Sequence, residues 1–107
     1  MKQQGVFVAL FAFTGCATTS SEMMTRAPFR SYVSSKHHAE IGQCIAATVP
    51  GTFVLPGPSA TIVNVQNPGG EVLLTWRVED GGSGGSRITV WRANSAAPGI
   101  SRAERCF

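Results

Sequence analysis

Charged residues are scarce in this sequence, at 14% of 107 residues, and its basic side chains are scattered rather than clustered. The formal net charge is only +3, and no stripe of Lys and Arg is available to neutralise successive phosphates. Nucleic acid is therefore excluded as an expected partner. The remaining composition is typical of a globular protein, and the length predicts one domain.

Groups of side chains that could hold a metal ion or catalyse a reaction are also lacking. The sequence has no Cys-x-x-Cys pair, and His37 and His38 are adjacent, so on a helix they would point about 100° apart. Residues 81–85 match the Gly-x-Ser-x-Gly pattern of serine hydrolases, but both histidines precede them and strands are expected on both sides. We expect no catalytic residue, no metal and no cofactor, and therefore a non-enzymatic protein.

No apolar run approaches the roughly 20 residues that a membrane-spanning helix needs. Residues 1–15 instead combine a short positive start with an apolar stretch of signal-peptide length. The stretch ends in Phe13-Thr14-Gly15-Cys16, which resembles the lipobox of bacterial lipoproteins, where a small residue precedes the cysteine that receives diacylglycerol. The alternatives are an ordinary secretory leader cut after an alanine such as Ala17, or a buried N-terminal segment.

The resemblance to lipoproteins implies a subcellular location for the protein. Acyl chains such as palmitate on Cys16 would hold the mature protein on a membrane, and two or more such chains give a stable anchor. In Gram-negative lipoproteins an aspartate directly after the lipidated cysteine commonly retains the protein at the inner membrane, whereas Ala17 occupies that position here. The resemblance therefore implies the outer membrane of the cell envelope, with the protein facing the periplasm.

The number of cysteines agrees with export. Three is an odd number for an exported protein, and lipidation of Cys16 leaves Cys44 and Cys106 as a pair in a compartment that permits disulfides. A bridge between them would close a loop of about 60 residues and stabilise the domain by roughly 4 kcal/mol. The alternative is two buried free thiols.

The residues beyond Cys16 predict a small, disulfide-stapled α+β domain. Residues 16–32 are polar and lack periodic apolar positions, which favours a flexible tether, so the domain is expected over 33–107. One helix at its amino end, capped by Ser34 or Ser35, is predicted before Pro50 from apolar residues at three- and four-residue spacing. It should pack on a three- to four-stranded antiparallel meander, and a short C-terminal helix should follow.

The turns between the strands predict a register. A four-residue loop at 67–70 would pair Val65 with Val72, and the glycine-rich loop after the next strand would pair Val78 with Ile88. One face of the sheet then becomes continuously apolar. The predicted helix would cover it.

The other face of this predicted sheet carries residue types that are common in binding hot spots. Ile62, Thr75 and Trp91 form a row on it, and Arg77 is diagonal to Trp91 at cation–π distance. These four residues are predicted to form a binding face. The alternatives are that the tether folds over this face, or that the register differs from the predicted one.

The layout of leader, lipobox, helix, β-meander and terminal cysteine resembles small uncharacterised lipoproteins of proteobacteria and their phages, a resemblance that implies no particular activity. We expect an envelope lipoprotein whose partners are the membrane, through lipid on Cys16, and an envelope protein. The first hypothesis is a non-enzymatic binding or accessory module. The alternative is an inhibitor of an envelope enzyme such as a lysozyme.

Overall fold

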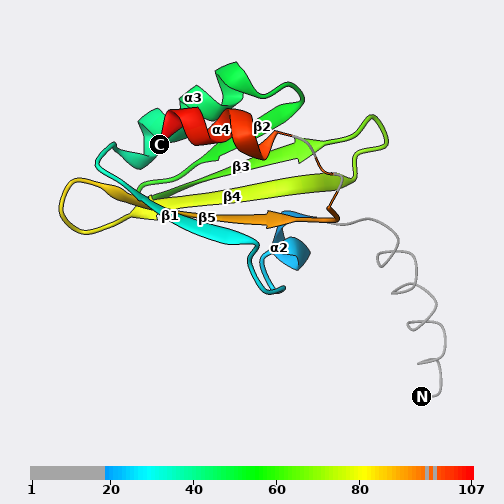
Figure 1. Cartoon of the computed structure of the whole chain (residues 1–107), viewed down its shortest axis with the longest axis horizontal. Helices are drawn as coiled ribbons and strands as arrows, with labels where there is room; N and C mark the ends of the chain where they lie inside the picture. The colour runs from blue at the N-terminus through cyan, green and yellow to red at the C-terminus, as the bar shows by residue number, and fades with distance from the viewer. Residues whose placement is uncertain (1–18, 96, 98) are drawn as a thin grey trace, which may run out of the picture.

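A five-stranded antiparallel sheet forms the centre of the structure, a computed structural model that describes residues 19–95, 97 and 99–107 (Figure 1). The spatial order of the strands is β1-β5-β4-β3-β2. Their bounds are β1 (Arg30–Ser34), β2 (Thr52–Pro56), β3 (Ala60–Gln66), β4 (Val72–Asp80) and β5 (Ser86–Arg92). The helices are α2 (Ser20–Met23), α3 (His38–Thr48) and α4 (Ile100–Ala103), and the 3-10 helix η1 (Glu104–Cys106) follows α4. The architecture is therefore α+β, and the expected leader and Cys16 lie outside the described residues.

The helices lie on both sides of the sheet (Figure 1). α3 contacts β2, β3 and β4 on one side and also contacts α4, whereas α2 contacts β4 from the other side. We call the first side, to which Val63 and Trp76 belong, the helical face, and the second side, to which Thr75 and Trp91 belong, the outer face. None of the described helices is both long and apolar enough to cross a membrane.

The main hydrophobic core lies between the helical face and the helices. Alternation along β4 and β5 directs every second side chain into it, and Val78 lies opposite Ile88 as the turn pattern predicts. Burial of these side chains is the main favourable contribution to folding. The buried members are Ile41, Ile45, Val49, Val63, Val65, Leu74, Trp76, Val78, Ile88, Val90, Ala103 and Cys106.

α3 begins later than its sequence pattern predicts. Its N-cap is His37, whose Nδ1 accepts a hydrogen bond from the backbone N–H of Ala39, rather than Ser34 or Ser35. The expectation of a single helix at the amino end of the domain is not supported, because α2 and β1 precede α3 in the chain.

His38, in the first turn of α3, connects this helix to β3 and is buried. Its Nδ1 lies 2.9 Å from Thr61 Oγ1, and its Nε2 lies 3.3 Å from the carbonyl oxygen of Pro58. Gly42 allows this close approach, since a Cβ there would lie 2.6 Å from the Thr61 side chain. A buried polar ring is tolerated here because both of its nitrogens have partners.

Ordered structure begins earlier than the domain boundary expected at residue 33. The flexible tether predicted over 16–32 contains α2 and overlaps β1, which pairs with β5 and places Tyr32 opposite Ile88. Each element has only one buried residue, Met23 in α2 and Ser34 in β1. Their sequences therefore carry little hydrophobic periodicity, and the sheet has one strand more than the meander predicted.

The register between β3 and β4 differs from the predicted one by two residues. Val65 lies opposite Leu74 rather than Val72, and the register shifts between Val65 and Gln66. The connection between β3 and β4 causes this difference. In it, the side-chain oxygen of Asn67 accepts a hydrogen bond from the N–H of Glu71, which holds a turn that differs from the predicted four-residue loop. A shift of two residues keeps Leu74, Trp76 and Val78 on the apolar face. Val72, beyond the irregularity, pairs with Gln66 and lies on the outer face instead.

The predicted disulfide between Cys44 and Cys106 is confirmed. It joins α3 to η1, with 5.7 Å between the two Cα atoms, and it spans a sequence separation of 62 residues. Since β2 to β5 all lie between the two cysteines, the bridge closes most of the folded chain into one loop. The C-terminal turn is thereby held on the helical face.

Replacing Cys44 and Cys106 together by alanine should lower the free energy of unfolding by about 2–4 kcal/mol, because the unfolded chain is no longer restricted by this loop. Urea unfolding with and without dithiothreitol measures the effect. Reduction should destabilise the native protein to the same extent and leave the double variant unchanged. Equal unfolding midpoints for the oxidised and reduced native protein would contradict a stabilising bridge.

Candidate functional site

The binding face predicted at Ile62, Thr75, Arg77 and Trp91 is only partly open. Thr75 and Trp91 are buried, with Trp91 only 4% exposed, whereas Ile62 and Arg77 are half-buried. The Arg77 guanidinium lies 5.2 Å from the centre of the Trp91 ring, at the predicted cation–π distance. The predicted row is wrong in one member: Asn64 lies opposite Thr75, and Ile62 lies opposite Arg77, because of the two-residue difference in register.

α2 and the residues after it cover Trp91. Met23 is fully buried and packs with Trp91 and Val72 in a small second core on the outer face. The indole Nε1 of Trp91 donates a hydrogen bond to the carbonyl oxygen of Arg26 at 2.9 Å. The segment expected to be a tether therefore folds over this part of the sheet, and Trp91 is a core residue.

Replacing Trp91 by alanine should lower the free energy of unfolding by about 3–5 kcal/mol, because it leaves a large cavity under α2 and an unpaired carbonyl at Arg26. Chemical unfolding measures the loss. Phe53→Ala is the control, since Phe53 lies on the same face and is 56% exposed, and it should cost no more than about 1 kcal/mol. Similar losses for the two variants would show that Trp91 is not core.

A cleft opens on the helical side, between the start of β1, the end of β5 and α4. Its volume is about 470 Å³, within the range of small-molecule sites. We call it the arginine cleft. Its lining residues are Phe29, Arg30, Arg92, Ala97, Gly99, Ile100, Ser101, Arg102 and Glu104.

Phe29 and two arginines form one wall of the arginine cleft. The guanidinium carbon of Arg92 lies 3.6 Å from the centre of the Phe29 ring, and that of Arg30 lies 4.7 Å from it. The backbone N–H of Phe29 donates to the carbonyl oxygen of Val90 at 2.8 Å, so the ring is attached directly to the sheet. Both guanidinium groups are therefore positioned by cation–π contacts to a ring that the backbone holds.

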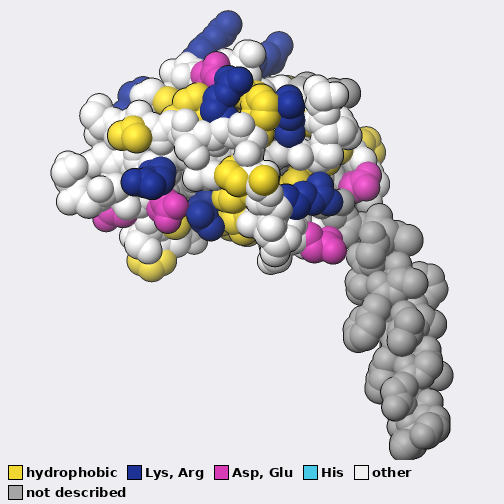
Figure 2. Space-filling model, turned by 60° about the horizontal axis from the view of Figure 1, so that its bottom comes forward, with side chains coloured by type: hydrophobic (Ala, Val, Ile, Leu, Met, Phe, Trp, Pro, Cys, Tyr) yellow, Lys and Arg dark blue, Asp and Glu magenta, His cyan; other side chains and the backbone are white. Residues whose placement is uncertain are grey.

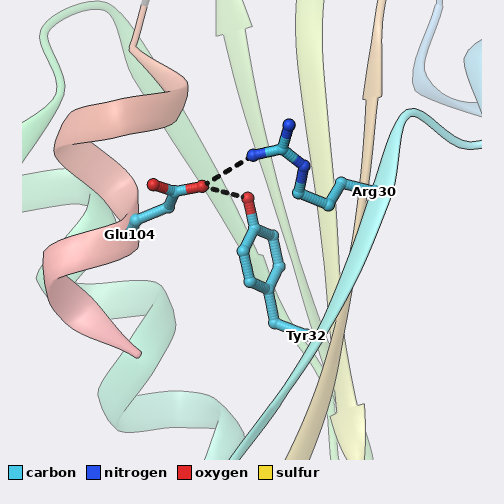
Figure 3. Close-up of polar contacts among 3 residues, drawn as sticks. All are labelled: Arg30, Tyr32 and Glu104. Carbon is cyan, nitrogen blue, oxygen red and sulfur yellow. Dashed lines mark hydrogen bonds and ion pairs between the residues drawn. The ribbon is translucent and has the colours of Figure 1, made fainter.

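Glu104 shows how an acidic group is held beside this wall (Figure 3). Its Oε2 accepts hydrogen bonds from Arg30, at 3.2 Å, and from the hydroxyl of Tyr32. Arg30 and Tyr32 come from β1 and Glu104 from η1, and the three side chains converge between the strand and the C-terminal turn (Figure 3). This cluster ties the two ends of the domain together.

Both donors of this cluster keep their protons at neutral pH. Burial, and next the hydrogen bond to Glu104, raise the pKa of the Tyr32 hydroxyl above its ordinary value. The pKa of Arg30 is also raised, first by its interaction with Tyr32 and next by that with Glu104. A protonated phenol and a guanidinium therefore face the carboxylate throughout the physiological pH range.

The other two arginines of the cleft have no acidic partner. Within the part of the chain that the structure describes, Arg92 and Arg102 form no ion pair, and Glu104, the acidic lining residue, is engaged with Arg30. The cleft therefore carries excess positive charge beside an apolar ring. A guanidinium presents a planar set of donors that matches a carboxylate, which makes an anionic group with an adjoining apolar group the complementary ligand.

The sequence did not indicate this site because its residues come from three separate segments. Phe29 and Arg30 lie in the expected tether, Arg92 ends β5, and Arg102 and Glu104 belong to the C-terminal tail. The adjacent Phe-Arg pair was the only local signal. Bringing the three segments together required β1 to pair with β5 and the tail to fold back onto the sheet.

No group of three or more His, Cys, Asp or Glu side chains suited to a metal ion occurs among the described residues. Residues 81–85 join β4 to β5, with the N–H of Gly81 donating to the carbonyl of Gly85 at 2.9 Å, so the Gly-x-Ser-x-Gly pattern lies in a hairpin loop. The strand-to-helix turn that places a nucleophilic serine in hydrolases is not the structure of this segment.

Comparison of the chain with protein-family models, with curated proteins and with solved structures finds no significant match. The function is therefore inferred from the leader pattern, the disulfide and the arginine cleft.

Proposed function

We propose that this chain is an exported lipoprotein, anchored in the cell envelope by lipid on Cys16, that acts as a non-enzymatic binding module. Its expected location is the outer membrane, where it faces the periplasm. The arginine cleft is its binding site and takes a carboxylate of the partner, an acidic side chain or a chain terminus.

The observation that carries the proposal is the disulfide between Cys44 and Cys106. Stable structural disulfides are typical of exported proteins and rare in the cytosol. The bridge uses two of the three cysteines and leaves Cys16, the cysteine that follows the leader, outside the pair. This division supports a lipidated Cys16 in an oxidising compartment.

The charge and shape of the arginine cleft support binding of a carboxylate. Glu104 already occupies one position there with Arg30 and Tyr32 as its donors, and the neighbouring Arg92 and Arg102 have side chains able to do the same for an external acid. Phe29 supplies an apolar surface beside them.

Globomycin, which blocks lipoprotein signal peptidase, should cause the precursor with its leader to accumulate. Replacing Cys16 by serine should abolish incorporation of labelled palmitate, because serine offers no thiol to receive the lipid. Immunoblotting and palmitate labelling of cells measure the two effects. Processing that continues unchanged in globomycin would contradict the lipoprotein proposal.

Benzoate, a planar carboxylate with an apolar ring, should bind in the arginine cleft with a dissociation constant on the order of millimolar, as expected for a probe this small. Backbone amide NMR signals of Ile100 and Ser101, which line the cleft, should shift on titration of the detergent-solubilised protein. The double variant Arg92→Gln and Arg102→Gln should lose the response, whereas Arg87→Gln, on the outer face, should keep it.

Benzylamine carries the opposite charge and is the ligand control for this titration. Equal responses to benzoate and benzylamine, or a benzoate response that survives in the double variant, would contradict a carboxylate site.

A further inference from the structure

The first described residues follow shortly after Cys16, the expected anchor, and they lie on the outer face of the sheet. Thr19, three residues after Cys16, is the N-cap of α2. Three residues span at most about 11 Å when fully extended. α2 packs on the outer face through Met23, which contacts Trp91. An anchor at Cys16 would therefore hold the outer face, rather than the helical face, near the bilayer.

The large hydrophobic side chains that the described part of the chain exposes lie on this outer face. Val33 is 83% exposed, Phe53 56% and Leu55 53%. Strand partners share a face, and the register pairs Phe53 with Asn64, Leu55 with Ile62 and Val33 with Arg87. Ile62 is half-buried and adds to the apolar surface around Leu55.

Phe53 lies at the same level of the sheet as α2. It belongs to the cross-strand row that runs through Asn64 and Thr75 to Trp91, the residue that α2 covers. Three strand spacings separate the ends of this row, a distance of about 14 Å. A flat surface that touches α2 at one end of the row would therefore also reach Phe53 at the other, and Leu55 lies two residues further along the same strand.

Basic side chains lie among these apolar ones. Figure 2 shows hydrophobic and Lys or Arg side chains interspersed, with several Asp or Glu side chains among them, on the side of the molecule that carries α2. Arg77 and Arg87 belong to the outer face, as does Glu79, which lies opposite Arg87 and forms an ion pair with Arg77 at 3.3 Å. Arg87 forms no ion pair within the described residues. Apolar side chains flanked by arginines suit the boundary between acyl chains and phosphate headgroups.

We propose that the outer face rests on the phospholipid bilayer to which Cys16 is anchored, with Phe53 and Leu55 at the boundary of the acyl chains and Arg77 and Arg87 among the phosphates. The inference rests on the proposed lipidation of Cys16. In this orientation the arginine cleft, on the helical side, points away from the bilayer and is open to a partner.

The orientation is tested with the full lipidated protein in vesicles of phosphatidylethanolamine and phosphatidylglycerol. A cysteine replaces Leu55 in one variant and Ala47, an exposed residue of α3, in the other, and each is labelled with an environment-sensitive fluorophore. Mass spectrometry first establishes lipid on Cys16 and an intact disulfide. Nitroxide-labelled lipids then quench any label that touches the bilayer.

The Leu55 label should emit at shorter wavelength and be quenched at least about threefold more than the Ala47 label, because an interfacial face enters the bilayer by about 5–10 Å while the opposite side stays in water. Equal quenching of the two labels on a lipidated protein would overturn the orientation and leave the anchor intact. Blue-shifted emission at Leu55 without lipid quenching would overturn it in favour of a second copy or a protein partner. Absence of lipid on Cys16 would overturn the anchor, and the orientation with it.

Discussion

Cys44 and Cys106 join α3 to the C-terminal turn, and the surroundings of the arginine cleft depend on that link. The turn it holds carries Glu104, which binds Arg30 and Tyr32 of β1. β1 is an edge strand with one buried residue and gains little from its own burial. Its pairing with β5 and its contacts with the tail together keep it in place.

Further contacts join β1 and the residues directly after it to the tail. The Ser34 hydroxyl donates to the terminal carbonyl of Phe107 at 3.0 Å, and the rings of Tyr32 and Phe107 lie 4.6 Å apart. The Lys36 ammonium donates to the carbonyl oxygen of Cys106 at 3.1 Å. One covalent bond thus organises a set of weak interactions, each of which contributes about 1 kcal/mol when its partner is already in place.

The two faces of the sheet are covered very differently, and this asymmetry links the fold to the proposed function. α3 and α4 cover the helical face, whereas α2 covers only the end of the outer face around Trp91. The open remainder carries Phe53 and Leu55, and it lies on the side from which the chain leads back to Cys16. A lipid anchor at that position and an arginine cleft on the opposite side would divide attachment and binding between the two faces.

Residue patterns predicted much of the fold where the signal was strong and local. Alternation identified β4 and β5 and their pairing through Val78 and Ile88, and the odd number of cysteines indicated the pair that forms the disulfide. Residue patterns did not predict the features that are stabilised by contacts with distant parts of the chain. α2 has four residues and one buried side chain, and the buried His38 depends on Thr61, which lies 23 residues away in the chain.

By itself, the sequence determined the α+β class, the central strands and the disulfide, because side-chain period and cysteine number are local properties that survive errors in loop length. Even the two-residue error in register left Leu74, Trp76 and Val78 on the predicted face, although Val72 changed face at the irregularity beside Gln66. Only the tertiary structure decided that Trp91 is covered by α2, that Arg30 and Arg92 meet over Phe29, and that Phe53 and Leu55 stay open. These facts depend on which distant segments pack together, and no residue of α2 or of the C-terminal tail carries that information alone.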